Sequence, residues 1–319
     1  MREALLGTSE LNQICFVVGD IEKAAGAFAT LLGVEKPNWF LTGTREVSQI
    51  VYNGVPTDAR NKLIFINTPS VQIELIEPDQ EPSTMRDFLN EREGIHHVAF
   101  NTDDMKKQVA LLGENGYPVI QTGEFTASKG RYAYVDTVPA CKTMVELLER
   151  DEPQPIPPVK PRGADDPQPL LGTDTLTQIA VVVKDLDAAA DAYCSLLGVE
   201  KPNVLKEGPS EVTQVVFRGE ETEAKARFLF IKTPLIEIEL IEPGDSPSTW
   251  KEHLETKGEG VHHISFLVKN MDEKIALMEE KGYPVIQTGN FWNGKGRYAY
   301  MDTTSDYHVI IELLEKFEG

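Results

Sequence analysis

The chain has 319 residues, of which 41% are hydrophobic and 26% are charged, a composition typical of globular proteins. Its 31 Lys and Arg residues stand against 51 Asp and Glu, and the net charge of −20 would repel a phosphate backbone, so we expect no nucleic-acid partner. No apolar run approaches the roughly 18 residues of a membrane span, and the 3 cysteines cannot form a closed set of bridges. We therefore expect a soluble cytoplasmic protein with buried, reduced thiols.

The first part of the chain predicts a strand, a helix and then three strands. Residues 13–18 form a β-rich run, and Asp20 can cap a helix whose apolar side chains recur at helical spacing until Gly33. The three strands that follow are predicted at 47–52, 63–67 and 71–76.

The same order then recurs, with a strand through Phe100 and a helix from Asp104 to about Asn115. Strands are predicted near Val119, at 132–135 and at 143–148. Residues 1–150 therefore consist of two βαβββ units.

The whole pattern is present twice. LNQICFVV at residue 11 matches LTQIAVVV at residue 176, and GYPVIQTG occurs verbatim at residues 116 and 282. Between the copies lie 7 prolines from Pro153 to Pro169, a composition that favours an extended linker and cannot supply a core. We predict a first domain over 1–150, a Pro-rich linker over 151–173 and a second domain over 174–319.

Strand alternation places one polar side chain per strand on the face of the sheet opposite the covering helix. A carboxylate or imidazole on such an apolar face is costly unless it is partnered, and four converging groups would satisfy one another best through a cation. The two predicted metal-ligand sets are Gln13, Glu74, His97 and Glu146, and Gln178, Glu239, His263 and Glu312. Oxygen donors with one imidazole suit a divalent Zn, Ni, Co, Mn or Fe(II) ion.

At these residues the sequence resembles the vicinal oxygen chelate superfamily, which contains glyoxalase I, methylmalonyl-CoA epimerase, bleomycin resistance proteins and extradiol dioxygenases. The resemblance covers nearly all of both halves. It implies an α+β fold of two tandem domains, in each of which paired βαβββ units form a cupped mixed β-sheet with helices outside. It also implies that each quartet holds a metal on the inner face of its sheet.

The resemblance implies chemistry next to a carbonyl group. The stretch ELIEP followed by a short helix and G-x-HH is similar to methylmalonyl-CoA epimerases, whereas the order Gln, Glu, His, Glu is similar to zinc glyoxalase I. Bacterial epimerases carry a second acid or base Glu where this sequence has Gln49 and Gln214. We expect a metal-dependent isomerase, epimerase or lyase in which Glu146 or Glu312 removes a proton α to a carbonyl, through a metal-bound enediolate.

Two alternatives stay open. The same fold can form a non-catalytic, resistance-type protein that binds a small molecule. An extradiol dioxygenase is less favoured, because each half offers one ligand histidine rather than two.

The remaining expectations concern neighbouring residues and partners. His96 and His262 should face the helix side as hydrogen-bonded core residues. The substrate should be a small hydroxy-carbonyl compound or thioester, and the acidic charge favours a neutral or weakly anionic one; the protein should be a monomer or homodimer. A weaker expectation is that loop cations hold a substrate carboxylate or phosphate, although they could equally pair with local acids: Lys129, Arg131, Lys295 and Arg297.

Overall fold

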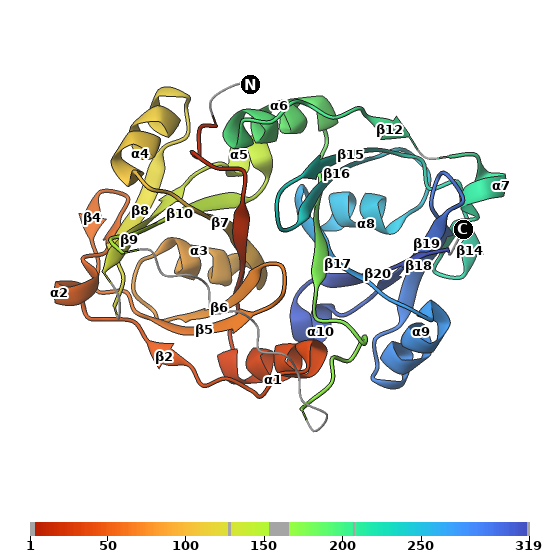
Figure 1. Ribbon diagram of the computed structural model, residues 1–319, viewed down its shortest axis with the longest axis horizontal. Coiled ribbons are helices and arrows are strands. Elements are labelled where there is room, and N and C mark those ends of the chain that lie inside the picture. The colour runs from red at the N-terminus through yellow and green to blue at the C-terminus, as the bar shows by residue number, and fades with distance from the viewer. Residues whose placement is uncertain (1–3, 127–128, 153–165, 207, 318–319) are drawn as a thin grey trace.

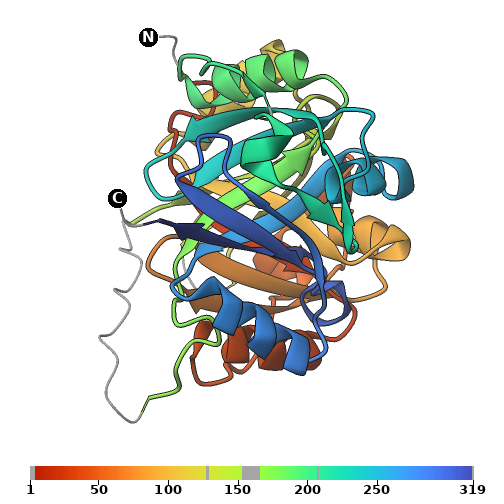
Figure 2. The ribbon, with the colours of Figure 1, turned by 90° about the vertical axis from the view of Figure 1, so that its right-hand side faces the viewer.

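The computed structural model describes residues 4–126, 129–152, 166–206 and 208–317. It confirms the α+β class and the tandem arrangement, with the two domains side by side in Figure 1 and one behind the other in Figure 2. The elements of the first domain are β1 (Leu11–Val17), α1 (Ile21–Leu32), β2 (Phe40–Leu41), α2 (Arg45–Ser48), β3 (Val51–Tyr52), β4 (Val55–Pro56), β5 (Asn61–Asn67), β6 (Gln72–Pro78), α3 (Thr84–Glu91), β7 (Gly94–Asn101), α4 (Met105–Glu114), β8 (Val119–Glu124), β9 (Gly130–Val135), α5 (Val138–Cys141) and β10 (Met144–Arg150).

The second domain repeats this order element by element. Its elements are β11 (Leu176–Val182), α6 (Leu186–Leu197), β12 (Leu205–Lys206), α7 (Ser210–Thr213), β13 (Val216–Phe217), β14 (Glu220–Glu221), β15 (Ala226–Lys232), β16 (Glu237–Pro243), α8 (Thr249–Thr256), β17 (Gly260–Leu267), α9 (Met271–Glu280), β18 (Val285–Asn290), β19 (Gly296–Met301), α10 (Thr304–Tyr307) and β20 (Ile310–Lys316).

Each domain forms one curled mixed sheet. In the described part of the first domain the strand order is β2-β5-β6-β1-β7-β10-β9-β8-β3-β4, and the second domain has the equivalent order. The first strands of the two βαβββ units, β1 and β7, pair antiparallel at the centre, and β6 and β10 pair parallel with them on either side. The four strands predicted to carry the site are therefore adjacent.

Strand alternation separates the two faces of the sheet. Ile14 and Phe16 of β1 belong to the core cluster beneath α1, a helix that begins at its cap Asp20 and ends at Gly33 with φ 62°. Cys15 and Val17 belong to a different cluster on the concave face, which α3 covers. In Figure 1, α3 and α8 lie within the curve of the sheets, so not every helix is on the outside.

One predicted strand is wrong. Residues 47–52 were expected to be extended, but the chain forms the short helix α2, and Gln49 follows it with φ 45°. Only Val51–Tyr52 is a strand, and it pairs with β8 of the second unit. Local αL geometry at Gln49 interrupts the alternation that the sequence suggested.

The domains pack through reciprocal contacts. Tyr307 of α10 donates a hydrogen bond to the carbonyl of Ala27 in α1 at 3.3 Å, and Tyr193 of α6 donates one to the carbonyl of Cys141 in α5 at 3.0 Å. Chain segments also cross over, since the amide of Leu6 donates to Leu196 and the amide of Leu170 donates to Leu31. One apolar cluster contains buried side chains of both domains.

The predicted linker falls largely on residues 153–165, which lie outside the described residues. Its last part is not free chain, because Leu171 is buried in the core. All 3 cysteines are free and buried, as expected. Among the described residues no helix is long and apolar enough to cross a membrane.

Candidate metal centres

The first predicted quartet converges on the concave face. Gln13, Glu74, His97 and Glu146 project from β1, β6, β7 and β10, and each side chain is at most 5% exposed. His97 Nε2 lies 3.4 Å from Glu74 Oε2 and 3.1 Å from Glu146 Oε2. The structure therefore brings these four side chains to one face of four adjacent strands, with two carboxylates in contact with the imidazole.

The second quartet repeats this geometry. His263 Nε2 lies 3.3 Å from Glu239 Oε2 and 3.2 Å from Glu312 Oε2. The amide of Gln178 donates to Glu237 at 2.8 Å, and that of Gln13 donates to Gln72 at 2.7 Å. Because each amide nitrogen is used as a donor, its carbonyl oxygen is the atom left to serve as a ligand.

Both centres contain buried polar atoms that lie close to charged partners but lack hydrogen-bond geometry with any described residue. His97 Nε2, Glu74 Oε2 and His263 Nε2 make no hydrogen bond, although the carboxylates stand close by. Each unsatisfied buried polar atom costs about 1–3 kcal/mol of folding free energy, so a cluster of such atoms indicates a bound ligand or ion. A divalent cation would satisfy the lone pairs at once, and the donor set fits one.

Protons partly take the place of a cation in the metal-free centres. Burial alone would lower the pKa of His97, but the carboxylates of Glu146 and Glu74 outweigh it and raise the pKa to about 9. The pKa of His263 is likewise raised to about 9 by Glu312 and Glu239 against the effect of burial. Burial raises the pKa of Glu239 to about 7.

Metal affinity should therefore depend steeply on pH. At pH 7 an incoming ion must displace the proton on His97 or His263, so we expect the apparent affinity of the second centre to rise about tenfold per pH unit up to about 9 and then level off, and that of the first centre to rise at least as steeply. Competition with a chromophoric chelator of known pH dependence measures this. An affinity that does not change between pH 7 and 9 would contradict the assignment of these imidazoles as ligands.

The neighbouring histidines lie differently from our expectation. His96 was placed on the helix side of β7, but the pairing register passes from Cys15 opposite His97 to Phe16 opposite Ile95, so His96 occupies a β-bulge. Its Nε2 lies 3.1 Å from Thr84 Oγ1 of α3, and its Nδ1 lies 2.9 Å from His97 Nδ1. His96 is thus a hydrogen-bonded buried residue that orients the ligand imidazole, a supporting role that metal-binding histidines commonly require.

The second domain has the same histidine arrangement. His262 Nδ1 lies 2.8 Å from His263 Nδ1, and His262 Nε2 lies 3.1 Å from Thr249 Oγ1 of α8. Burial lowers the pKa of His262 well below its ordinary value. In each pair one imidazole is kept neutral and positions the other.

The expected loop cations lie elsewhere. Arg131 pairs with Glu149 at 3.2 Å and Asp151 at 2.9 Å, and Arg297 pairs with Asp272 and Glu315. Lys129 and Lys295 are exposed. None of these four cations is among the described residues that line the cavities above the two quartets. The two arginines therefore pair with local acids, which was the alternative to a substrate role. Gln49 and Gln214 are also exposed.

The two concave faces enclose cavities of different size. The cavity above the second quartet has a volume of about 590 Å³, whereas that above the first has about 170 Å³. A volume of roughly 300–1,000 Å³ is usual for small-molecule sites. The aromatic side chains that line the larger cavity are Phe228, Phe230, Trp250, Phe291, Trp292, Tyr298 and Tyr300.

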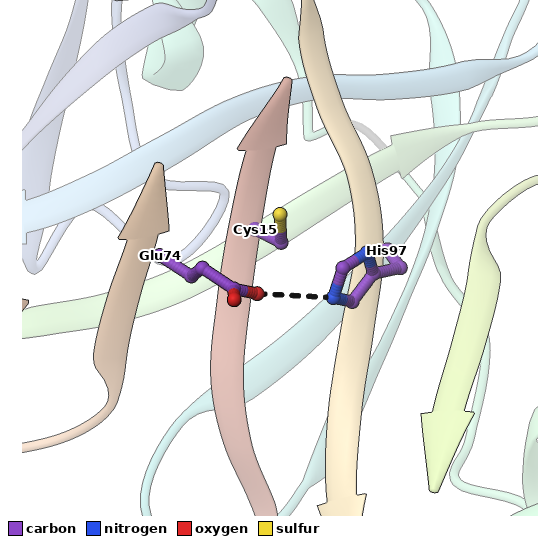
Figure 3. Close-up of side chains that lie close together, drawn as sticks. All are labelled: Cys15, Glu74 and His97. Atoms are coloured by element: carbon purple, nitrogen blue, oxygen red, sulfur yellow. Dashed lines mark ion pairs between the residues drawn. The ribbon is translucent and has the colours of Figure 1, made fainter. Parts of the chain in front are cut away.

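Sequence reasoning missed two polar residues beside the quartets. Cys15 lies next to Glu74 and His97, as Figure 3 shows, and Ser265 donates a 2.5 Å hydrogen bond to Glu312 Oε2. Both project from strands toward the concave face, where alternation places them on the same face as the predicted ligands but indicates no role for them. Neither has a counterpart in the other domain, where Ala180 and Ala99 occupy the matching register positions.

A family sequence model matches both copies. It describes the Glyoxalase/Bleomycin resistance protein/Dioxygenase superfamily and covers residues 12–135 and 177–300. This double match agrees with the internal repeat.

Curated relatives match one domain at a time. An ethylmalonyl-CoA/methylmalonyl-CoA epimerase of Cereibacter sphaeroides is 31% identical over 119 residues, which are 36% of this chain and 76% of the relative. The mitochondrial methylmalonyl-CoA epimerase of Homo sapiens is 27% identical over 126 residues, covering 34% of this chain and 64% of the relative.

Two solved structures align with nearly the full chain. A mutant of 4-hydroxymandelate synthase from Streptomyces coelicolor aligns with a TM-score of 0.58 at 13% identity, covering 98% of this chain and 94% of that one. BphC, a halotolerant catechol dioxygenase, aligns with a TM-score of 0.50 at 14% identity, covering 97% of this chain and 87% of that one. At these identities the likeness concerns the fold.

Proposed function

Since the chain belongs to the Glyoxalase/Bleomycin resistance protein/Dioxygenase superfamily, we propose that it is a metal-dependent isomerase, epimerase or lyase acting at the carbon next to a carbonyl group. One observation carries this proposal. A buried carboxylate, imidazole and carboxylate, with an unsatisfied imidazole nitrogen, lie at the base of a cavity large enough for a ligand.

The proposed metal ligands of the second domain are Gln178, Glu239, His263 and Glu312. A divalent ion bound there would act as a Lewis acid toward two substrate oxygens and so acidify the adjacent C–H bond. A quartet of protein donors leaves two positions of an octahedral ion for those oxygens. The metal could be Zn, Ni, Co, Mn or Fe(II).

The proposed catalytic residue is Glu312, and Glu146 is its counterpart at the same repeat position of the first domain. A carboxylate can take the acidified proton and return it to the same or a neighbouring carbon. Ser265 donates to Glu312 Oε2 and so fixes the rotation of that carboxylate, while His262 holds His263. Trp250, with 1% exposure, lines the cavity and excludes water from its base.

The larger cavity favours an anionic substrate, despite the acidic chain. Lys206, Lys232 and Lys316 line it, and Lys232 is the register partner of Glu237 on the neighbouring strand. They balance the glutamates Glu237, Glu239 and Glu312 of the same lining, so a bound divalent ion would leave the cavity positive. We propose a hydroxy-carbonyl compound or acyl thioester that carries a carboxylate or phosphate.

The smaller cavity offers a less favourable environment for an anion. One cation, Arg150, lines it together with Glu74, Glu124 and Glu146. The guanidinium of Arg150 lies 5.1 Å from the ring centroid of Phe125. We therefore propose that substrate turns over in the second domain.

Proton exchange tests the function. The metal-loaded chain is incubated in deuterated buffer with hydroxy-carbonyl compounds and acyl thioesters, in matched anionic and neutral pairs, and the α-proton signal is followed by NMR. We expect exchange with the anionic members, loss of exchange on chelation and recovery on adding metal, because the ion acidifies that proton.

Two outcomes would contradict the proposal. Tight binding without exchange would favour the non-catalytic, resistance-type alternative. Oxygen consumption with Fe(II) would favour a dioxygenase; the single ligand histidine of each quartet argues against it, since His96 and His262 bond to Thr84 and Thr249.

A further inference from the structure

The two centres differ in the residue at the middle of the site. Cys15 on β1 is the register partner of Glu74 on one side and of His97 on the other. In the second domain Ala180 is the partner of Glu239 and His263. A thiol therefore stands in the first centre where the second has a methyl group.

The thiol is within reach of a shared ion. Cys15 Sγ, a carboxylate oxygen of Glu74 and a ring nitrogen of His97 all lie within 4.8 Å of one another. Figure 3 shows the Glu74 carboxylate and the His97 imidazole facing each other, with the Cys15 side chain close to both. Metal–sulfur bonds of about 2.3 Å and metal–nitrogen bonds of about 2.0–2.1 Å fit a group of this size.

A second observation points to a ligand at this place. His97 Nε2 and Glu74 Oε2 are buried and lie 3.4 Å apart, and His97 Nε2 lies 3.1 Å from Glu146 Oε2, yet neither His97 Nε2 nor Glu74 Oε2 has a partner at hydrogen-bond geometry among the described residues. Cys15 and His97 are both 0% exposed. An ion between the three side chains would use the unsatisfied lone pairs.

We propose that the first domain holds a thiolate-containing metal site formed by Cys15, Glu74, His97 and Glu146, chemically distinct from the oxygen and nitrogen site of the second domain. Binding replaces the thiol proton by the ion and releases that proton to solvent. Softer ions such as Zn²⁺ are favoured where a thiolate is present, and harder ions such as Mn²⁺ where it is absent. This inference rests on the metal binding proposed above, but not on turnover.

The small volume of the first cavity fits a structural metal site. A structural metal site has its coordination completed by protein donors, whereas a catalytic site keeps an open position. The thiolate would supply the completing donor in the first domain, above which only about 170 Å³ is free. The first ion would then stabilise the fold, and the second would meet substrate.

Cobalt substitution of the full chain tests the donor directly. A thiolate bound to Co²⁺ gives a near-ultraviolet charge-transfer band that oxygen and nitrogen donors do not give. We expect this band in the wild type and its loss in Cys15→Ala. The matched variant Ala180→Cys should roughly double the band, because Ala180 has the same register in its sheet as Cys15. The variant that carries both Cys15→Ala and Ala180→Cys should show the band at about its wild-type intensity.

Controls separate this inference from the proposed function. Cys141→Ala and Cys194→Ala remove the other buried thiols, which lie in the core beneath the helices, and should leave the band unchanged. Two bound cobalt ions without a thiolate band in the wild type would overturn this inference alone, whereas no bound cobalt would overturn the metal-dependent function as well. If Cys15→Ala does not fold, the gain expected of Ala180→Cys still decides the question.

Discussion

Glu312→Gln should reduce α-proton exchange by about 10²–10⁴-fold, the usual contribution of a positioned general base. The amide keeps the size and one oxygen of the carboxylate but cannot accept the proton. Glu146→Gln, the matched change in the first domain, should leave exchange within about a factor of two, because the small cavity and acidic lining exclude the proposed substrate. NMR-monitored exchange with anionic substrate measures both, and metal content is determined on the same samples.

The comparison of the two variants shows which domain turns over substrate. Equal losses in both would show that the domains turn over substrate alike and would refute the assignment of turnover to the second domain. Full activity in Glu312→Gln would place the base elsewhere. Loss of bound metal from Glu312→Gln would require adding metal until the site is saturated before exchange is compared.

The repeat allowed much of the site to be predicted from sequence. Because side chains alternate along a strand, the positions of Gln13, Glu74 and Glu146 on the concave face followed from their apolar neighbours. The helix over Ile21–Leu32 followed from its cap and apolar spacing. These are local properties, because they depend on the residues of one segment and not on the segments that pack against it.

What the sequence did not reveal depends on contacts between distant segments. The β-bulge at His96 is a mismatch between β1 and β7, and neither strand shows it alone. The role of Cys15 depends on Glu74 and His97 arriving on either side of it. A buried thiol and a metal ligand look the same in sequence, since both favour apolar surroundings.

The charge of the cavity was also beyond sequence reasoning. The net charge of −20 suggested a neutral or weakly anionic substrate, but the field at a site depends on the nearest groups. Lys206, Lys232 and Lys316 come from β12, β15 and β20, and only the curl of the sheet brings them to one cavity. Their counterparts in the first domain at the same repeat positions are Leu41, Asn67 and Arg150.

Removing the ligand histidines should remove the metal in steps. We expect about two divalent ions per wild-type chain, about one in His97→Ala or His263→Ala, and none in the double variant, because each imidazole is the one nitrogen donor of its centre. Mass spectrometry of protein purified without chelator measures this. His308→Ala, which removes a histidine outside both centres, should keep both ions.

The same variants connect metal binding with folding. In each metal-free centre a protonated imidazole stands between two buried carboxylates, so its removal leaves uncompensated charge, a loss of about 3–5 kcal/mol in comparable buried pairs. Adding metal to protein that has been stripped of it should raise the unfolding temperature of the wild type most and that of each single variant less. It should not raise the unfolding temperature of the double variant. If the double variant still bound two ions, the ions would lie elsewhere and both metal centres would be refuted. If His97→Ala lost far more metal-dependent stability than His263→Ala, the first centre would be the structural one, as its closed donor set and small cavity require.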